Sequence, residues 1–407
     1  WLGVWRPQQS LPGRVCGTHA YLCLAMVPMT AWWFGGASMV AALANFLLVP
    51  LVTLVVVPLA LLGAALCLLS VPEFAVPWRW AAACLEWLVE PARALAASHR
   101  QWLYTWLSPG PWEMALAVIA VGLLVIPRLP QLRLLAAVLM LPMLLRAQDV
   151  VPSQPTLRVM DVGQGTAVLF RSGSRTLLYD TGGGNPVGPN VASTVITPFL
   201  RKQGLAALDT LIISHPDNDH SAGAATLLGS LPVSRYRFGG GSVVAQSGGL
   251  PCRAGEAWRW PSGETFQFLA PAAEVALSSN DVSCVLQIEV AGQRILLPGD
   301  VSASRERVLV AYWGDTLASD WLLAAHHGSR SSSSWAFLKA VKPASVLFSH
   351  GYGNHFGHPH PEVVARARQL AANVHATATS GAVQLEFLAD GRVRFSSWRQ
   401  GQRYYWM

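Results

Sequence analysis

The chain has 407 residues, with 29 Lys and Arg against 22 Asp and Glu, and only 13% of its residues are charged. It is too long for one ordinary domain, and a hydrophobic share of 52% excludes a chain built only of soluble domains. The first 150 residues are dominated by Leu, Ala, Val and Trp, whereas all but a handful of the acidic residues follow them. We therefore predict a membrane part over 1–150 and a soluble domain over 151–407.

The membrane part begins with a long apolar run. No charged side chain occurs from Tyr21 to Ser70, although a single membrane span needs only about 20 residues. The second half of this run is interrupted near Pro50 and Pro58, which could instead divide it into two shorter helices. With the later apolar stretches, the pattern predicts four spans, at about 20–36, 38–70, 112–126 and 132–145.

The segment Trp78–Trp106 mixes apolar residues with Arg and Glu, which is typical of an amphipathic segment at the membrane interface. Arg128 and Arg133 flank the turn between the last two spans, and the positive-inside tendency places that turn in the cytoplasm. The chain after Arg146 would then emerge on the outer side. Because the sequence starts at Trp1 without a signal-peptide pattern, we expect a fragment of a longer membrane protein.

Two of the six cysteines, Cys252 and Cys284, lie in the predicted soluble domain. They lack the close paired spacing of a zinc ribbon. If the domain lies outside the cytoplasm, a disulfide between them is expected. The alternative is two unconnected buried thiols.

After Pro152, short strand-like runs alternate with Gly-rich turns and modest helical stretches, which predicts an α/β layered domain. The expected strands are 157–162, 167–171, 176–179, 211–214, 285–290, 295–297, 321–325 and 346–349. The expected helices are 221–229, 304–313, 333–341 and 361–372.

Possible metal ligands gather at the ends of these strands. The run Leu211–Ser214 is followed within six residues by His215, Asp217, Asp219 and His220. Other strand exits carry Asp180, Asp300, the pair His326 and His327, and a group of histidines that includes His358. A strand, a ligand-rich loop and a helix N-terminus are typical of a dinuclear metallohydrolase. The alternative, helix capping, needs one such residue rather than four.

These motifs together resemble a known family. The order Asp161-Val162-Gly163-Gln164-Gly165, Asp180-Thr181-Gly182, His215…His220, Gly299-Asp300 and His326-His327-Gly328-Ser329 is similar to the metallo-β-lactamase-like domain of the ComEC family. That family forms the inner-membrane channel for DNA uptake in natural competence. The apolar run Asn45–Leu51 resembles the end of its membrane competence domain.

The resemblance implies an α-helical transmembrane segment followed by an α/β metallo-β-lactamase-like domain, an αββα sandwich. It implies a multi-pass protein of the bacterial inner membrane, with the soluble domain on the periplasmic side. The expected cofactors are two divalent metal ions, manganese or zinc. The expected partners are the incoming DNA strand, the membrane and other competence-uptake proteins.

The sequence departs from the superfamily pattern at three places. Asp217 stands where a second histidine is usual, and Thr166 stands where an acidic residue usually follows the Asp161–Gly165 motif. Between His220 and Asp300 there is no histidine, although many members supply a ligand there. Asp217 makes the site richer in oxygen, which favours manganese over zinc.

We assign His215 and Asp217 to one ion, Asp219 and His220 to the other, and Asp300 as a bridge between them. Of His326 and His327 only one need be a ligand, and His358 is a further ligand or a phosphate contact. Asp219, Asp300 and His326 are the expected catalytic residues, and Asp219 could accept the proton of the nucleophile if it is not a ligand. Hydrogen-bonding support for the ligands is expected from Asp161, Asp180 and Gln164.

The predicted reaction is hydrolysis of a phosphodiester bond. From Pro152 onward, 21 Lys and Arg stand against 17 Asp and Glu, and five arginines could form a path for a polyanion: Arg235, Arg237, Arg253, Arg259 and Arg330. Three interpretations remain open. They are a nuclease coupled to a DNA channel, a hydrolase of a small-molecule or cell-envelope phosphodiester, and a domain that binds metal and DNA without cleavage.

Overall fold

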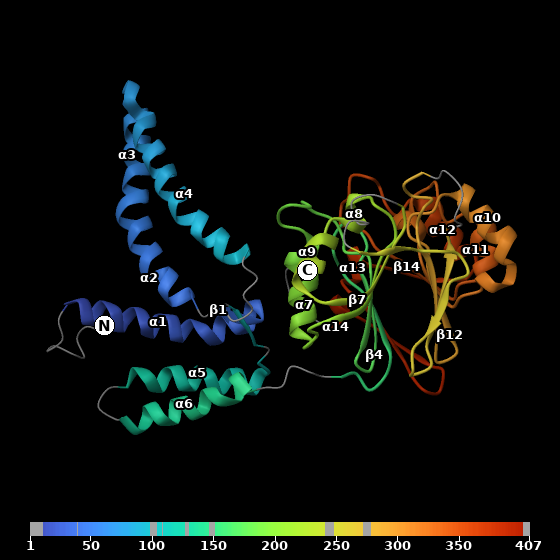
Figure 1. Ribbon diagram of the computed structural model, residues 1–407, viewed down its shortest axis with the longest axis horizontal. Helices are drawn as coiled ribbons and strands as arrows, with labels where there is room; N and C mark the ends of the chain where they lie inside the picture. The colour runs from blue at the N-terminus through green and yellow to red at the C-terminus, as the bar shows by residue number, and fades with distance from the viewer. Residues whose placement is uncertain are drawn as a thin grey trace. The chain divides into compact units, whose positions relative to one another are not determined.

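The computed structural model describes residues 11–38, 40–97, 104–107, 109–126, 130–145, 151–240, 248–271 and 278–401. The chain divides into two compact units, 1–148 and 149–407 (Figure 1). Arg128 and Arg146, on which the predicted membrane topology partly rests, lie outside the described residues.

The first unit is helical. Its helices are α1 (Leu11–Phe34), α2 (Ala41–Leu51), α3 (Val57–Leu68), α4 (Ala75–Ala97), α5 (Pro111–Val125) and α6 (Pro130–Leu145), and β1 (Gly36–Ser38) pairs with β2 (Tyr104–Trp106). A π-helical turn, Val52–Val56, joins α2 to α3 without a break. Proline lacks an N–H and crowds the preceding turn, and this wider turn lies between Pro50 and Pro58. The predicted interruption is therefore a local π-helical turn within one continuous helix.

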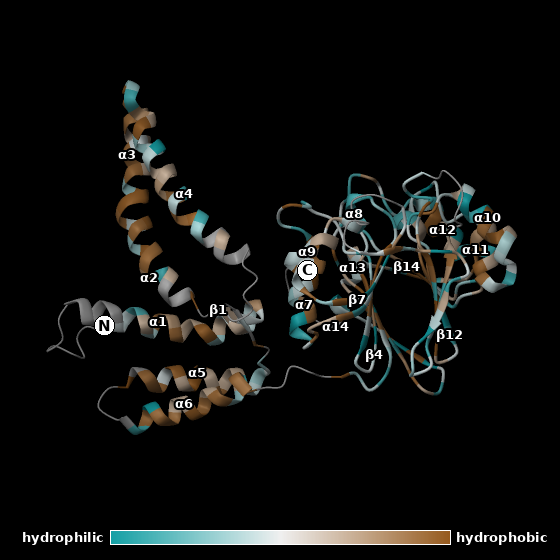
Figure 2. Cartoon of the chain, viewed as in Figure 1, coloured by the Kyte–Doolittle hydropathy of each residue, from teal (hydrophilic) through white to brown (hydrophobic). Residues whose placement is uncertain are grey.

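Among the described residues, one helical stretch, Ala44–Leu68, is long and apolar enough to cross a membrane, with a mean hydropathy of 2.7. Two shorter apolar helices, Pro111–Leu124 and Gln131–Leu145, follow it. Figure 2 shows α3, α5 and α6 as hydrophobic over most of their length. By length and composition, the 44–68 stretch is thus the strongest candidate span in the described part of the chain.

Most of the segment predicted to lie at the membrane interface belongs to helix α4, which forms a hairpin with α3. Helix α4 runs back along α3. The indole nitrogen of Trp78 donates a hydrogen bond to the carbonyl of Ala60 at 3.0 Å, and its ring covers Gly63, where an added Cβ would meet the ring at 2.5 Å. The absence of a side chain at Gly63 thus leaves room for the ring of Trp78 against α3, and the interfacial placement stays a prediction.

The second unit contains two sheets. The eight-stranded sheet has the order β17-β16-β3-β4-β5-β6-β7-β8, and the seven-stranded sheet has the order β15-β14-β13-β12-β11-β10-β9. The strands of the first sheet are β3 (Thr156–Val159), β4 (Val168–Ser172), β5 (Arg175–Tyr179), β6 (Leu208–Ile213), β7 (Val233–Phe238), β8 (Leu250–Pro251), β16 (Val383–Phe387) and β17 (Val393–Ser397). Those of the second are β9 (Ala257–Arg259), β10 (Thr265–Ala270), β11 (Val285–Val290), β12 (Gln293–Leu297), β13 (Trp321–Leu323), β14 (Ser345–Phe348) and β15 (Asn373–Ala376).

Three hydrophobic clusters hold this unit in layers. The largest lies between the sheets and includes Phe170, Phe266 and Leu286, all buried. The other two lie on the outer faces of the sheets, under helices that follow the strands (Figure 1). The helices over the eight-stranded sheet are α7 (Thr197–Lys202) and α9 (Ala224–Ser230), and those over the seven-stranded sheet are α10 (Ala303–Trp313), α11 (Trp335–Val341) and α12 (Pro361–Gln369). The domain is thus an αββα sandwich, as expected.

Parallel strands bring the candidate ligands to one edge of the sandwich. Strand β5 pairs parallel with β6, and β12, β13 and β14 are parallel neighbours. The carboxyl ends of neighbouring parallel strands lie at the same edge of a sheet. Residues that follow β5, β6, β12 and β13 therefore meet there, although they are far apart in the sequence.

Candidate metal centre

Four side chains converge at this edge: Asp219, His220, Asp300 and His327. Their candidate ligand atoms all lie within 4.8 Å of one another. Nε2 of His220 lies 3.1 Å from Nε2 of His327 and 3.2 Å from Oδ1 of Asp300. Nε2 of His327 lies 3.1 Å from Oδ2 of Asp219 and 3.5 Å from Oδ2 of Asp300. Two nitrogen and two carboxylate ligands facing one point form a donor set that zinc, manganese or iron can use.

The backbone turns sharply to present these groups. His326 and His327 both adopt left-handed conformations, with φ of 53° and 55°, which are uncommon for residues other than glycine. Asp300 follows Gly299, whose φ is +60° and whose absent Cβ leaves room for Ser283. Ser283 Oγ in turn accepts a hydrogen bond from the backbone N–H of Asp300 at 3.1 Å. Strained or glycine-dependent backbone at two ligand positions is typical of a functional site.

The hydrogen bonds of two histidines fix which ring nitrogen faces the centre. Nδ1 of His220 lies 2.7 Å from Oδ2 of the buried Asp180, and Nδ1 of His327 lies 2.8 Å from the carbonyl of Ser349. Both acceptors are oxygens, so each Nδ1 carries the hydrogen and donates. Nε2 of each ring then faces the centre, and its lone pair is available to a metal once the ring has lost its second proton, the arrangement found in metal-bound histidines.

The electrostatics of the four residues are strongly coupled. Burial alone would raise the pKa of Asp300, but the charges of His220 and His327 outweigh it and hold this pKa well below its usual range. Burial likewise opposes the charged form of His220, yet Asp300 and Asp180 raise its pKa well above the usual value. The buried carboxylates thus favour a positive charge between the four side chains, and a metal cation supplies such a charge.

Buried histidine nitrogens without a partner test whether a metal fits. Among the described residues, Nε2 of His215, Nε2 of His350 and Nδ1 of His358 are buried and make no hydrogen bond. A buried polar nitrogen without a partner costs free energy, and binding to a metal is one way to satisfy it. His215 stands next to the four-residue cluster, with its ring centroid 4.2 Å from that of His220. The donor set and these nitrogens fit the predicted metal ions.

The other predicted ligands surround the four-residue cluster without joining it. Asp217 is part-exposed, and its Oδ2 lies 3.6 Å from Nε2 of His215. Nε2 of His326 lies 3.8 Å from Oδ2 of Asp300. The ring of His358 lies 5.6 Å from that of His326 and 6.2 Å from that of His327. The structure therefore favours His327 over His326 as the ligand of the adjacent pair.

Of the three predicted supporting residues, Asp180 has the most direct place. Its carboxylate accepts hydrogen bonds from His220 and from both the backbone N–H and the hydroxyl of Ser214, at 2.6 and 2.8 Å for the last two. Gln164 Oε1 accepts from the backbone N–H of Gly351 at 3.4 Å. Asp161 pairs with Arg399 at 3.0 Å. These two contacts connect neighbouring loops, and neither is to one of the four converging ligands.

Sequence reasoning missed Ser214. Its hydroxyl, besides bonding Asp180, lies 3.0 Å from Nδ1 of His215 and 3.3 Å from Nδ1 of His220. The signal was its position, directly between the strand and the first histidine. Thr181 was also missed, and it donates from both its backbone N–H and its hydroxyl to the carbonyl of His220, at 2.8 and 2.9 Å.

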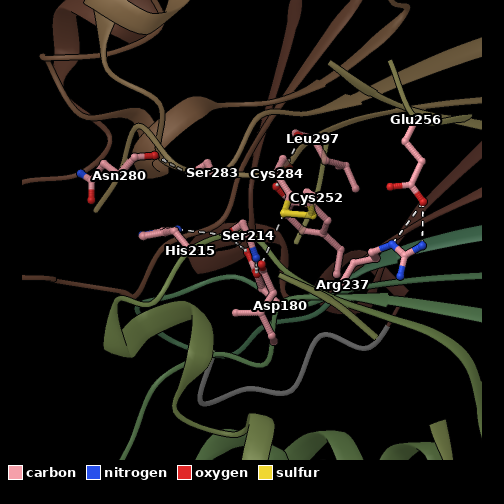
Figure 3. Close-up of a disulfide and its surroundings, with 12 residues drawn as sticks. Asp180, Ser214, His215, Arg237, Cys252, Glu256, Asn280, Ser283, Cys284 and Leu297 are labelled. Carbon is pink, nitrogen blue, oxygen red and sulfur yellow. Dashed lines mark hydrogen bonds and ion pairs between the residues drawn. A yellow bond between two sulfur atoms is a disulfide. The ribbon is translucent and has the colours of Figure 1, made fainter. Parts of the chain in front are cut away.

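A disulfide joins Cys252 to Cys284 behind this loop, as the sequence predicted. The backbone N–H of Cys284 donates to the carbonyl of Ser214 at 2.9 Å. Figure 3 shows the disulfide next to Ser214, whose side chain faces Asp180 and His215. The disulfide therefore links the end of β8 to the start of β11, and the hydrogen bond from Cys284 holds the start of β11 against the end of β6.

The five arginines of the predicted polyanion path do not form one uncompensated surface. Arg237 pairs with Glu256 at 2.7 Å, and Arg330 lies 3.4 Å from Glu362. The guanidinium of Arg235 lies over the ring of Trp258, 5.0 Å from its centroid. Arg253 and Arg259 are exposed.

The fold and the cluster define a class, the metallo-beta-lactamase superfamily, whose family model matches residues 160–351. A second family model, that of competence proteins, matches residues 2–131. Competence protein ComA of Neisseria gonorrhoeae is 34% identical over 96% of this chain and 54% of its own length. Recombination protein 2 of Haemophilus influenzae is 35% identical over 60% of this chain and 32% of its own length.

With both domains in this order, the chain resembles competence proteins of the ComEC type. It spans about half the length of the curated relatives it matches, or less. Among solved structures, the metallo-beta-lactamase fold protein YhfI from Bacillus subtilis is 16% identical with a TM-score of 0.38, over 60% of this chain and 100% of that one.

Proposed function

We propose that this chain is a membrane-bound component of DNA uptake whose soluble domain hydrolyses phosphodiester bonds of incoming DNA. The observation that carries the proposal is the convergence of Asp219, His220, Asp300 and His327 within 4.8 Å, in a chain that also carries a competence domain. Asp219, His220, Asp300 and His327 would hold the divalent ions, and two carboxylates with two imidazoles form a donor set that suits manganese or zinc.

The chemistry divides between the ions and the protein. When bound, divalent ions lower the pKa of a bound water and stabilise charge on a phosphoryl oxygen. Asp219 has a side chain that is 32% exposed, and it lines a cavity of about 550 Å³ beside the centre. Where it is not a ligand, Asp219 would accept the proton of the attacking water. His326, whose side chain is 27% exposed, would donate a hydrogen bond to the phosphate.

The disulfide supports the proposed compartment. Disulfides persist in oxidising spaces such as the periplasm and are rare in the cytosol. The bond between Cys252 and Cys284 thus supports a soluble domain on the periplasmic side of the inner membrane. Incoming DNA would meet the centre there, beside the other proteins of uptake.

A cleavage assay tests the proposal. The full chain in detergent micelles is incubated with labelled single- and double-stranded DNA and with manganese or zinc. We expect metal-dependent cleavage that Asp300→Asn abolishes. Asp315→Asn is a matched control, because the Asp315 side chain is 98% exposed and its ion pair with Lys342 lies on the surface.

Two results would contradict the proposal in different ways. Hydrolysis of bis(p-nitrophenyl) phosphate without any cleavage of DNA would favour a small-molecule or cell-envelope phosphodiester as substrate. Metal-bound protein that binds DNA and cleaves neither substrate would favour a binding domain.

A further inference from the structure

An exposed aromatic ring stands at the edge of the metal centre. The loop between β14 and α12 presents Tyr352 and Phe356, whose exposed fractions are 88% and 56%. Contiguous exposed apolar patches mark binding sites, whereas a single exposed aromatic side chain carries no such information by itself. Phe356 is the informative one, because it also lines the cavity that Asp219 borders.

A line of rings connects Phe356 to the ligands. The ring of Phe356 lies 5.7 Å from that of His358, with an angle of 22° between their planes. His358 in turn stacks on His327, with centroids 6.2 Å apart and planes at 24°. His355 also lies against Phe356, with ring centroids 3.9 Å apart, so Phe356 is held between two histidines and reaches His327 only through His358.

The loop holds this ring in place. The side-chain amide of Asn354 donates to the carbonyls of Gly351 and His358, at 3.0 and 2.6 Å, and its Oδ1 accepts from the backbone N–H of His358 at 3.0 Å. These hydrogen bonds join residues before Phe356 in the loop to a residue after it. The exposed ring is therefore preorganised, which lowers the entropy lost when a ligand binds.

The rest of the cavity suits a flat, neutral group next to a phosphate. Its volume is about 550 Å³, and Gly183 and Gly184 form part of its wall. Asn218 fixes Gly184 by two hydrogen bonds, from the backbone N–H at 3.2 Å and to the carbonyl at 2.9 Å. Asp219 is the charged residue of this lining and lies at the metal end. A nucleotide matches both ends, with its phosphate at the centre and its base in the cavity.

We propose that Phe356 is a stacking platform for an unpaired nucleobase and makes the centre selective for single-stranded DNA. The inference rests on the proposed phosphodiesterase function and adds the form of its substrate. A base within a duplex is stacked on both faces and offers no free face to a protein ring, whereas a base of a single strand does. Stacking tolerates every base, so the platform adds strand selectivity without sequence selectivity.

The test measures binding and cleavage separately. The full chain in detergent micelles, with its ions bound, is titrated with a fluorescent single strand whose phosphorothioate linkages resist hydrolysis. We expect Phe356→Ala to weaken binding about 5- to 150-fold, the range found when one stacking ring is removed. Phe356→Tyr should bind like the unchanged protein. So should Tyr312→Ala, which removes an exposed ring from α10 outside the cavity lining.

An abasic strand gives the complementary result. The unchanged protein should bind a strand without bases as weakly as Phe356→Ala binds a normal strand. Phe356→Ala should bind the strand without bases no more weakly than that, because both changes remove the same contact. Equal binding of normal strands by Phe356→Ala and by the unchanged protein would overturn the proposal, as would an equal loss for duplex DNA. If Phe356→Ala cleaves and binds DNA as well as the unchanged protein does, the stacking proposal alone is contradicted and the nuclease function stands. Ring-dependent binding without cleavage supports the platform and contradicts the nuclease function.

Discussion

Ser214 connects the side chains on which the centre depends. Its hydroxyl donates to Asp180 and lies within 3.3 Å of Nδ1 in both His215 and His220. Groups that orient metal-binding histidines affect affinity nearly as strongly as the ligands do. The position of this serine at the strand end explains why one small residue can serve two ligands.

We predict that Ser214→Ala weakens metal binding about 10- to 100-fold, the usual effect of losing such a supporting hydrogen bond. Isothermal titration of manganese or zinc into metal-stripped protein measures it. Ser221→Ala is the matched control, because its hydroxyl donates to the carbonyl of Pro216 at the other side of the same loop. An unchanged affinity in Ser214→Ala would show that the histidines are oriented without this hydroxyl.

At the residue scale, the sequence indicated the ligands but not their arrangement. The four converging residues were all among those predicted. The sequence could not choose between His326 and His327, because their left-handed backbone conformations decide which ring faces inward. It also could not show that Asp217 stays part-exposed, since adjacent positions in a loop face directions that only the folded backbone sets.

At the scale of elements, the ends of β6 and β7 lie in close contact. The backbone N–H of Gly239 donates to the carbonyl of Ile213 at 2.9 Å. A Cβ at Gly239 would overlap the carbonyl oxygens of Ser214 and Val282. This glycine thus allows the strand end that carries the first ligand to lie against its neighbour.

We predict that Gly239→Ala destabilises the soluble domain by about 3 kcal/mol, because the obstructing atoms are backbone and cannot rotate away. A drop in the thermal midpoint of about 6–12 °C should follow. Gly229→Ala is the control, since nothing lies within 4 Å of its Cβ position and it sits in helix α9. Equal midpoints for both variants would mean that β6 and β7 shift apart at little cost.

The disulfide between Cys252 and Cys284 is a second feature that stabilises the arrangement of the strands. It closes a loop between residues 32 positions apart, and in the chain-entropy model such a bond stabilises by about 3–4 kcal/mol. We predict that the double variant Cys252→Ala with Cys284→Ala loses about this much free energy of unfolding. Hydrogen exchange on peptides covering β10 and β11 measures the loss. Unchanged protection of both strands would show that the sheets hold the loop without it.

The order of elements in the soluble domain was well predicted where strands carry strong apolar runs, as at Val285–Val290. Strands β7, β8, β9 and β10 and the C-terminal β15, β16 and β17 were missed. Strand β7, for example, contains Arg235 and Arg237, which break the apolar pattern. Their side chains are accommodated by Trp258 and Glu256 from a segment distant in sequence. Tertiary contacts of this kind are not visible in local propensity.

At the scale of the whole molecule, the two units differ in composition and in their cysteines. The described helices include one stretch suited to a membrane, whereas the layered unit carries the disulfide. Under the proposed function, the layered unit lies in the periplasm. Cysteines of the two units should therefore differ in redox state.

We predict that protein harvested with its thiols blocked keeps Cys252 and Cys284 oxidised, while Cys23, Cys67 and Cys84 are alkylated. Mass spectrometry before and after reduction distinguishes the two groups. These three cysteines, which are free in the described part of the chain, act as internal controls for complete alkylation. If Cys252 and Cys284 are alkylated as well, the soluble domain faces a reducing compartment and the periplasmic placement is wrong.

The central claim is that Asp219, His220, Asp300 and His327 form a metal centre. The most direct measurement is the metal content of the purified full chain and of Asp300→Asn, by elemental mass spectrometry after exhaustive dialysis. The account predicts about two ions per chain in the unchanged protein, since Asp300 is proposed to bridge two ions. It predicts loss of most metal in a variant that stays folded. Full metal content in Asp300→Asn, or none in the unchanged protein after reconstitution, would contradict it.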